Sequence, residues 1–277
     1  MMPAEINDLS KLCVHTITTK PWPIEKAAEK YAQAGVKGIT VWRQALEGRD
    51  PVMVGEMLKS YNMKVVSLCR GGFFASASSV IRQKAIEDNI KALDEAAALG
   101  APMLVLVCGA DPAQSLGKSR MQIKIGIETI LVHAEAYDVK LAIEPLHPMY
   151  ADSRSAINTI RQANDIAEAI GSKDVGVAVD VYHLWWDPDL EREIHRCGEM
   201  EKLFAFHVCD WKTPTIDMLN DRGLMGKGCI NIKKIRGWVE QTGFDGFHEV
   251  EIFSDIYWKQ DQDEFLAKIV NAYMNNV

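Results

Sequence analysis

Eight short runs rich in apolar and β-branched residues alternate along the chain with eight longer segments of helical period. In one such segment Ile86, Ile90 and Leu93 recur at intervals of four and three, which places them on one face of a helix. Because a helix must return the chain to the start of each following strand, this alternation predicts a parallel sheet. Eight such units in about 250 residues match the (β/α)8 barrel. The runs span residues 12–17, 38–42, 64–69, 103–108, 140–145, 175–181, 203–208 and 248–253.

The alternative α/β fold is the open, doubly wound sheet. That fold usually carries a glycine-rich phosphate turn after its first strand, whereas residues 15–23 (HTITTKPWP) contain no glycine. No Pro/Ser-rich linker, low-complexity tract or long charge block divides the chain. The sequence therefore predicts one α/β domain, a single (β/α)8 TIM barrel over residues 1–277. Glycines that fit helix C-termini precede four of the predicted strands, and these are Gly35, Gly100, Gly171 and Gly243.

Composition excludes several classes of function. The formal net charge of −7, without a compensating run of Lys or Arg, makes nucleic acid an unfavourable partner. No apolar run approaches 18 residues, so we expect no membrane partner. Six cysteines without a CxxC pair indicate free thiols in a reducing compartment. The N-terminal residues lack the apolar stretch of a signal peptide, and a cytoplasmic location is expected.

Ionisable side chains end four consecutive predicted strands. Side chains at the carboxyl ends of parallel barrel strands converge on one mouth. Buried charges are unfavourable unless they are paired or bound to a cation, so four at one level predict a divalent metal ion. On the last of these strands Glu249 and Glu251 share a parity, and the register places Glu251 at the mouth and Glu249 one layer deeper. The four predicted ligands are Glu144, Asp180, His207 and Glu251.

Three carboxylates and one imidazole make an oxygen-rich set of ligands. Such a set favours Mn, Mg or Co over a thiolate-type zinc site, although zinc stays open. A six-coordinate ion would keep about two positions for neighbouring oxygens of a substrate or for water. This arrangement suits a polyol or a sugar.

Four motifs, AIEPLHP, AVDVYHLWWDP, FHVCDW followed by DRGLMGKG, and DGFHEVEIF, resemble the sugar phosphate isomerase/epimerase family of xylose isomerase-like TIM barrels. The resemblance spans nearly the whole chain. It implies an enzyme of carbohydrate metabolism that holds one divalent ion, often Mn. It also implies that Glu144 and Glu251 form the catalytic acid/base pair on opposite sides of a bound sugar, while Asp180 and His207 act only as ligands.

Further residues are candidates for substrate binding. His183 and Arg222 match the His and Arg that contact the substrate in the family. His147 lies three residues after Glu144 and is a candidate hydrogen-bond donor or third acid/base. Trp186 is a candidate wall for a sugar ring, and Arg70 is a candidate for an anionic group.

The resemblance implies a ketose or keto-polyol isomerase or epimerase that removes and returns a proton through a metal-stabilised enediolate. The alternative function is a lyase that removes water or an aglycone from a keto-inositol, a dehydroshikimate or a C-glycoside. Such a lyase begins with the same proton abstraction. A phosphodiesterase of the endonuclease IV type is remote, because the chain has only seven histidines. Family members are often homo-oligomers, and some act with a small partner subunit, so both kinds of partner stay open besides the small-molecule substrate.

Overall fold

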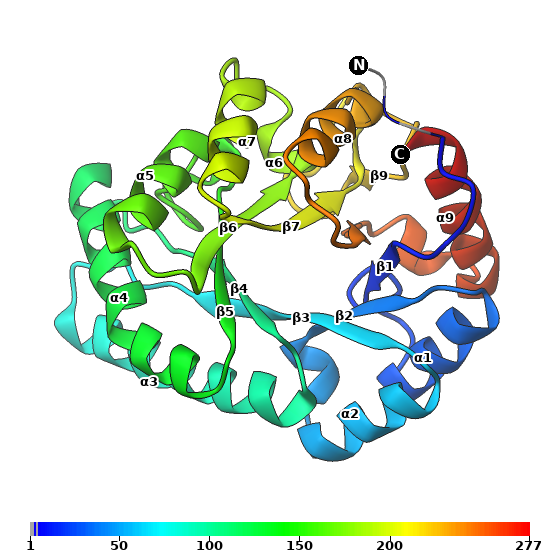
Figure 1. The fold of residues 1–277 in the computed structure, drawn as a ribbon, viewed down its shortest axis with the longest axis horizontal. Coiled ribbons are helices and arrows are strands. Elements are labelled where there is room, and N and C mark those ends of the chain that lie inside the picture. The colour runs from blue at the N-terminus through cyan, green and yellow to red at the C-terminus, as the bar shows by residue number, and fades with distance from the viewer. Residues whose placement is uncertain (1–2, 4) are drawn as a thin grey trace.

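The computed structural model describes residue 3 and residues 5–277 as a closed barrel of eight parallel strands (Figure 1). The first strand pairs with both the second and the last, and this pairing closes the sheet. The open, doubly wound alternative is therefore excluded. In order around the barrel the strands are β1 (Leu12–His15), β2 (Gly38–Trp42), β3 (Lys64–Gly72), β4 (Met103–Val107), β5 (Lys140–Glu144), β6 (Val175–Asp180), β7 (Leu203–Val208) and β10 (His248–Val250).

Long helices cover the outside of the barrel, and short elements follow the carboxyl ends of several strands (Figure 1). The outer helices are α1 (Ile24–Gln33), α2 (Pro51–Ser60), α3 (Ser79–Leu99), α4 (Leu116–Ala136), α5 (Ile160–Ile170), α7 (Leu190–Glu199), α8 (Ile232–Gln241) and α9 (Gln262–Asn276). The short elements are the 3-10 helices η1 (Arg43–Leu46), η2 (Pro148–Tyr150) and η3 (Tyr257–Lys259), the helix α6 (Val181–Leu184), and the paired strands β8 (Asp210–Trp211) and β9 (Arg222–Gly223).

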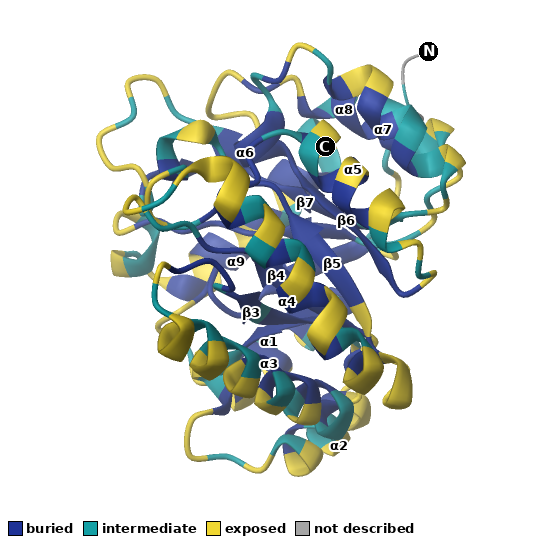
Figure 2. Cartoon of the chain, turned by 90° about the vertical axis from the view of Figure 1, so that its left-hand side faces the viewer, coloured by how far each residue is buried: buried dark blue, intermediate teal, exposed yellow. Residues whose placement is uncertain are grey.

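The core has two parts, one between the strands and the helices and one inside the barrel. The outer part is the larger, and Figure 2 shows the strands buried behind helices whose outer faces are exposed. Ala142, Ala178 and Ala205 belong to the inner part. Because side chains alternate across a strand, the residues two positions later on β5, β6 and β7 also face the interior, one layer nearer the mouth.

Three strand ends differ from the sequence prediction by more than one residue, and one of them is the end of β3, which continues to Gly72 instead of ending at residue 69. The first strand ends at His15 rather than at residue 17, and the last ends at Val250 rather than at residue 253. The hydroxyl of Thr18 donates to the carbonyl of Val250 at 3.0 Å and accepts from the amide of Ile252 at 3.0 Å. On the β1 side a side chain thus replaces the backbone ladder, and Glu251 lies just beyond β10.

Other local predictions are confirmed. All four glycines predicted at helix C-termini have positive φ, between 74° and 86°. All six cysteines are free, and only Cys229 is exposed. Among the helices that the structure describes, none combines the length and the apolarity that crossing a membrane requires.

Two glycines of α4 provide a matched test of the packing between helix and barrel. A Cβ at Gly126 would lie 2.4 Å from a ring carbon of Phe74, whereas a Cβ at Gly117 would meet nothing within 4 Å. We expect Gly126→Ala to lower the free energy of unfolding in urea by about 1–3 kcal/mol. Gly117→Ala should raise it by up to about 1 kcal/mol, since alanine is the better helix former. Equal effects of the two substitutions would contradict this packing.

Candidate functional site

The four predicted ligand residues converge at the carboxyl-terminal mouth of the barrel. One ligand atom of each lies within 4.8 Å of those of the other three. All four side chains are buried, and Asp180 and His207 have no exposed surface. Glu144, Asp180 and His207 come from neighbouring strands β5, β6 and β7, and Glu251 follows β10, which pairs with β7. Their donor set, which is rich in carboxylate oxygen, fits a hard divalent cation.

Arg222 contacts two members of this cluster. Its Nη1 donates to Oδ2 of Asp180 at 3.1 Å and to Oε2 of Glu251 at 2.5 Å. Its Nη2 lies 3.1 Å from Nε2 of His183. Nδ1 of His207 lies 2.9 Å from Oε1 of Glu144. One guanidinium therefore links the two acidic groups on one side of the cluster, while the histidine and the other glutamate pair on the other side.

Burial and charge set the protonation of the cluster. Burial raises the pKa of Asp180 to about 7, even though Arg222 opposes the shift. Burial also disfavours the charged form of Glu251, but Arg222 and His15 outweigh it and hold its pKa well below the usual range. For His207 burial lowers the pKa, whereas Glu249 and Glu144 raise it, and the result is about 9. The cluster thus holds exchangeable protons that a bound cation would displace.

A second polar layer lies deeper in the barrel. Glu249 accepts from the hydroxyl of Thr40 at 2.5 Å, and its Oε2 lies 3.1 Å from Nε2 of His15. The other ring nitrogen of His15 lies 3.1 Å from Glu251. Nε2 of His207 is buried without a hydrogen-bond partner among the described residues, 3.8 Å from Glu249. This layer therefore supports Glu251 and His207 from below.

The connection that follows β7 positions Arg222 at the cluster. Asp210 in β8 accepts four backbone amides, from Trp211, Gly226, Gly228 and Ile230, at 2.8–3.0 Å. Lys212 pairs with Asp221, directly before Arg222. The buried carboxylate thus fixes the segment that follows β9.

The pocket above the cluster is narrow, about 10 Å³ in volume. Two of the predicted substrate-binding residues, His183 and Arg222, line it, whereas His147, Trp186 and Arg70 are not among its lining residues. The ring of His147 packs against Trp186, with centroids 5.6 Å apart, and its amide donates to His183 at 3.3 Å. The lining comprises Trp42, Val107, Glu144, Leu146, Tyr150, Arg154, His183, Leu219, Arg222, Glu251 and Phe253.

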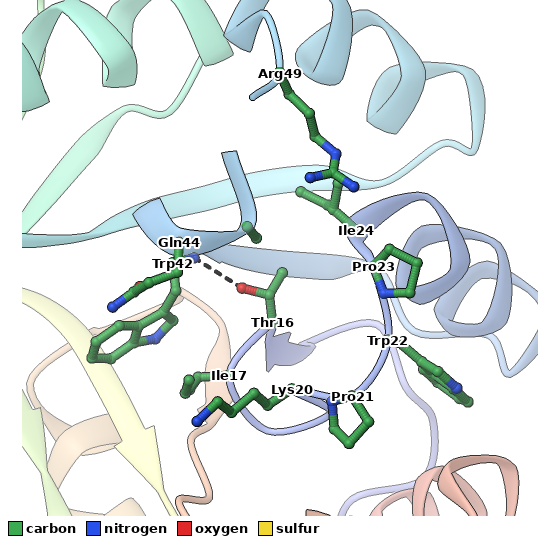
Figure 3. Close-up of a pocket in the computed structure, with 11 residues that line it drawn as sticks. Thr16, Ile17, Lys20, Pro21, Trp22, Pro23, Ile24, Trp42, Gln44 and Arg49 are labelled. Carbon is green, nitrogen blue, oxygen red and sulfur yellow. Dashed lines mark hydrogen bonds between the residues drawn. The ribbon is translucent and has the colours of Figure 1, made fainter. Parts of the chain in front are cut away.

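A larger hollow of about 420 Å³ lies beside this pocket, on the β1 side of the mouth. Trp42 lines both the pocket and the hollow. Figure 3 shows Arg49 and Trp22 in the parts of the hollow that are farther from Trp42. The amide of Trp42 donates to the hydroxyl of Thr16 at 2.9 Å, which fixes this wall between the two spaces (Figure 3).

Several residues of the site are absent from the sequence-based prediction. His15 ends β1 as the only ionisable residue of that strand apart from a cysteine, so its position at a strand end could have indicated it. Phe253 follows Glu251 by two residues and shares its parity. Tyr150 and Arg154 lie in and after η2, where no periodic pattern points to the pocket.

The fold and the cluster at its mouth define a parallel TIM barrel with a candidate site built from carboxylates and histidine. The chain belongs to the xylose isomerase-like TIM barrel family, whose model matches residues 28–269. This confirms the resemblance found in the sequence.

Three individual proteins are similar to this chain in structure or in sequence. The crystal structure of protein SMc04130 from Sinorhizobium meliloti 1021 is 44% identical, covers 97% of this chain and 99% of its own, and has a TM-score of 0.94. The IOLI protein with a binding zinc atom is 20% identical over 96% of this chain and 97% of its own, with a TM-score of 0.84. A curated protein named inosose isomerase, from Halalkalibacterium halodurans, is 27% identical over 134 residues, which are 47% of this chain and 45% of the relative. The chain thus matches less than half the length of this curated relative.

Proposed function

We propose that this chain is a sugar isomerase or epimerase that moves a proton on a ketose or keto-polyol. One observation carries the proposal: four buried ligand-type side chains meet within 4.8 Å at the barrel mouth, and two of them are glutamates, one at the end of β5 and one directly after β10. Glutamates paired in this way can serve as base and acid on one substrate carbon.

In this proposal Glu144, Asp180, His207 and Glu251 hold one divalent ion. Manganese is the expected metal for this oxygen-rich set, with magnesium, cobalt or zinc as alternatives. The zinc atom bound by the structurally similar IOLI protein supports a divalent ion as the metal of this proposal. Such an ion supplies Lewis-acid polarisation of a carbonyl oxygen and its neighbouring hydroxyl, which acidifies the intervening C–H bond.

Side chains of the protein carry out the proton transfers and stabilise the developing charge. One of the two glutamates, Glu144 or Glu251, removes the proton, and the other returns it to the opposite face when the centre is inverted. Burial and the charge of Arg222 lower the pKa of His183 well below its ordinary value, so its imidazole stays neutral. Arg222 and His183 are placed to hydrogen-bond the oxygen on which negative charge develops.

The name of the curated relative supports a keto-polyol as one substrate class. That relative is an inosose isomerase by name, although the match spans 45% of its length. Ketoses and keto-polyols share the carbonyl beside a hydroxyl that this mechanism requires.

Deuterium exchange tests the proposed function. The purified protein is loaded separately with Mn, Mg, Co or Zn and incubated in heavy water with a panel of ketoses and inososes, and C–H loss is followed by NMR. We expect metal-dependent exchange at one carbon next to a carbonyl, with an isomer or epimer as product. Loss of water or of an aglycone would replace this proposal by the lyase alternative. If the metal-loaded protein catalyses exchange on no member of the panel, both the proposed function and the lyase alternative are rejected.

A further inference from the structure

Two arginines near the mouth have no acidic partner. Arg70 lies in β3, and Arg154 follows η2. Within the part of the chain that the structure describes, neither guanidinium makes an ion pair or a hydrogen bond. Arg70 instead lies over the ring of Phe73 at 4.2 Å, and Arg154 lies 5.8 Å from the ring centre of Tyr150. Guanidinium groups that are partly removed from water usually have a carboxylate or phosphate beside them.

The fold brings the backbone segments of these two arginines together at Gly109. Gly109 follows β4, which lies between β3 and β5 in the barrel. Its amide donates to the carbonyl of Arg154 at 2.8 Å. A Cβ on Gly109 would lie 2.7 Å from the Cα of Phe73, and its φ is +90°. A glycine at this point therefore permits the segment after β3 and the segment after η2 to approach each other.

The charges of the two arginines remain uncompensated. Burial, and next the charge of Arg154, lower the pKa of Arg70 to about 10. Asp88 on α3 attracts Arg70, but it is already bound by Arg43 through two hydrogen bonds of 2.9 and 3.0 Å. Two like charges near one another with no counter-ion of their own create a local potential that attracts an anion.

Arg154 lines the same pocket as Glu144 and Glu251. From this geometry we propose that the substrate is an anionic sugar, whose phosphate or carboxylate group binds between Arg70 and Arg154 while its reacting carbon lies at the two glutamates. The inference rests on the proposed function and narrows its substrate class. Phosphate and carboxylate share the paired oxygens that a guanidinium binds through two parallel hydrogen bonds.

The β1 side of the mouth offers a weaker anion site. Arg49, in the hollow of Figure 3, is neutralised by Glu25 through hydrogen bonds of 2.6 and 3.0 Å. Lys20 lies over the ring of Trp258 at 4.5 Å and is exposed. A single mobile ammonium lacks the paired geometry of the two arginines, so Lys20 serves as a competing candidate in the test.

The test compares matched substrates and matched variants of the metal-loaded protein. Deuterium exchange is measured on one ketose in neutral form, phosphorylated at its terminal hydroxyl, and oxidised there to a carboxylate. We expect a KM at least roughly tenfold lower for a charged form, and the better charged form identifies the group. Arg154→Gln and Arg70→Gln should raise that KM roughly tenfold to a hundredfold, and the KM of the neutral form should rise by a much smaller factor.

Three controls separate anion binding by the two arginines from a general loss of charge or of stability. Arg161→Gln, an exposed arginine on α5, should change nothing. Arg70→Gln and Arg154→Gln should have a free energy of unfolding close to that of the parent, because the repulsion between like charges that each removes offsets the lost contact with an aromatic ring. Titration with inorganic phosphate provides a readout without turnover, and its binding should weaken roughly tenfold in Arg154→Gln but not in Arg161→Gln.

The outcomes that overturn the inference are distinct from those that overturn the proposed function. Exchange of the neutral ketose as efficiently as its charged forms, or a loss of charge preference in Lys20→Gln alone, rejects the arginine site and leaves the isomerase or epimerase intact. Absence of exchange with every sugar rejects the proposed function, and phosphate binding that is equal in Arg154→Gln and the parent then rejects the anion site as well.

Discussion

Glu251→Gln should nearly abolish deuterium exchange at the substrate carbon, with kcat lower by about 10²–10⁴-fold. The amide keeps the shape of the side chain but neither accepts a proton at neutral pH nor carries the charge that pairs with Arg222 at 2.5 Å. The measurement is NMR exchange at saturating substrate, together with a separate metal titration, because glutamine is also a weaker ligand. Exchange at the parent rate in metal-loaded Glu251→Gln would remove Glu251 from the mechanism.

Two further variants make this test specific. Glu144→Gln should lower turnover by a similar factor, since it removes the partner carboxylate. Glu249→Gln is a matched control, because Glu249 is buried on the same segment two residues earlier but does not line the pocket. Its effect on kcat should be much smaller and should appear mainly as lower stability. Equal losses in Glu249→Gln and Glu251→Gln would mean that burial of the strand end, rather than proton transfer, explains the defect.

Removal of the metal should abolish exchange, and its return should restore it. Free metal at a concentration of about 100 times its dissociation constant should raise the free energy of unfolding by about 2.7 kcal/mol. The affinity should also depend on pH, because the metal displaces protons from the ligands. In the metal-free protein the pKa of His207 is about 9, since Glu249 and Glu144 outweigh burial, and burial raises that of Asp180 to about 7.

The direction of this pH dependence follows from those two groups. Below about pH 9 binding releases a proton from His207, and below about pH 7 it releases a second from Asp180. The association constant should thus fall about tenfold per pH unit between pH 9 and pH 7, and more steeply below pH 7. Calorimetric titration in buffers of different ionisation enthalpy measures the released protons. An affinity independent of pH over this range would contradict ligation by His207 and Asp180.

The barrel and the composition of the cluster were predictable because each depends on a short local pattern. Alternation of strands and helices requires parallel connections, and the parity of side chains along a strand places Glu144, Asp180 and His207 on the interior. The end of β10 was not predictable in the same way, because the hydroxyl of Thr18, distant in sequence, replaces its backbone ladder.

The rim of the site depends on contacts between distant segments. Arg222 lies in the short strand β9 within a long connection, and contacts of this connection with distant residues, among them the hydrogen bonds of Asp210, bring its guanidinium to Asp180 and Glu251. His147 follows Glu144 by three residues in a motif, yet its ring packs against Trp186 and Trp211. Spacing in the sequence therefore indicated proximity to the site but not the direction in which the side chain points.

The sequence by itself determined the eight-stranded barrel, the family and the four residues that meet at its mouth, because periodicity and strand position act locally. Only the tertiary structure decided which groups surround that quartet. It brought His15 beneath Glu251 and placed Arg154 at the pocket, with Arg70 on a nearby strand. These contacts join segments far apart in the chain, and loop conformation is set by packing and hydrogen bonds that no local pattern records.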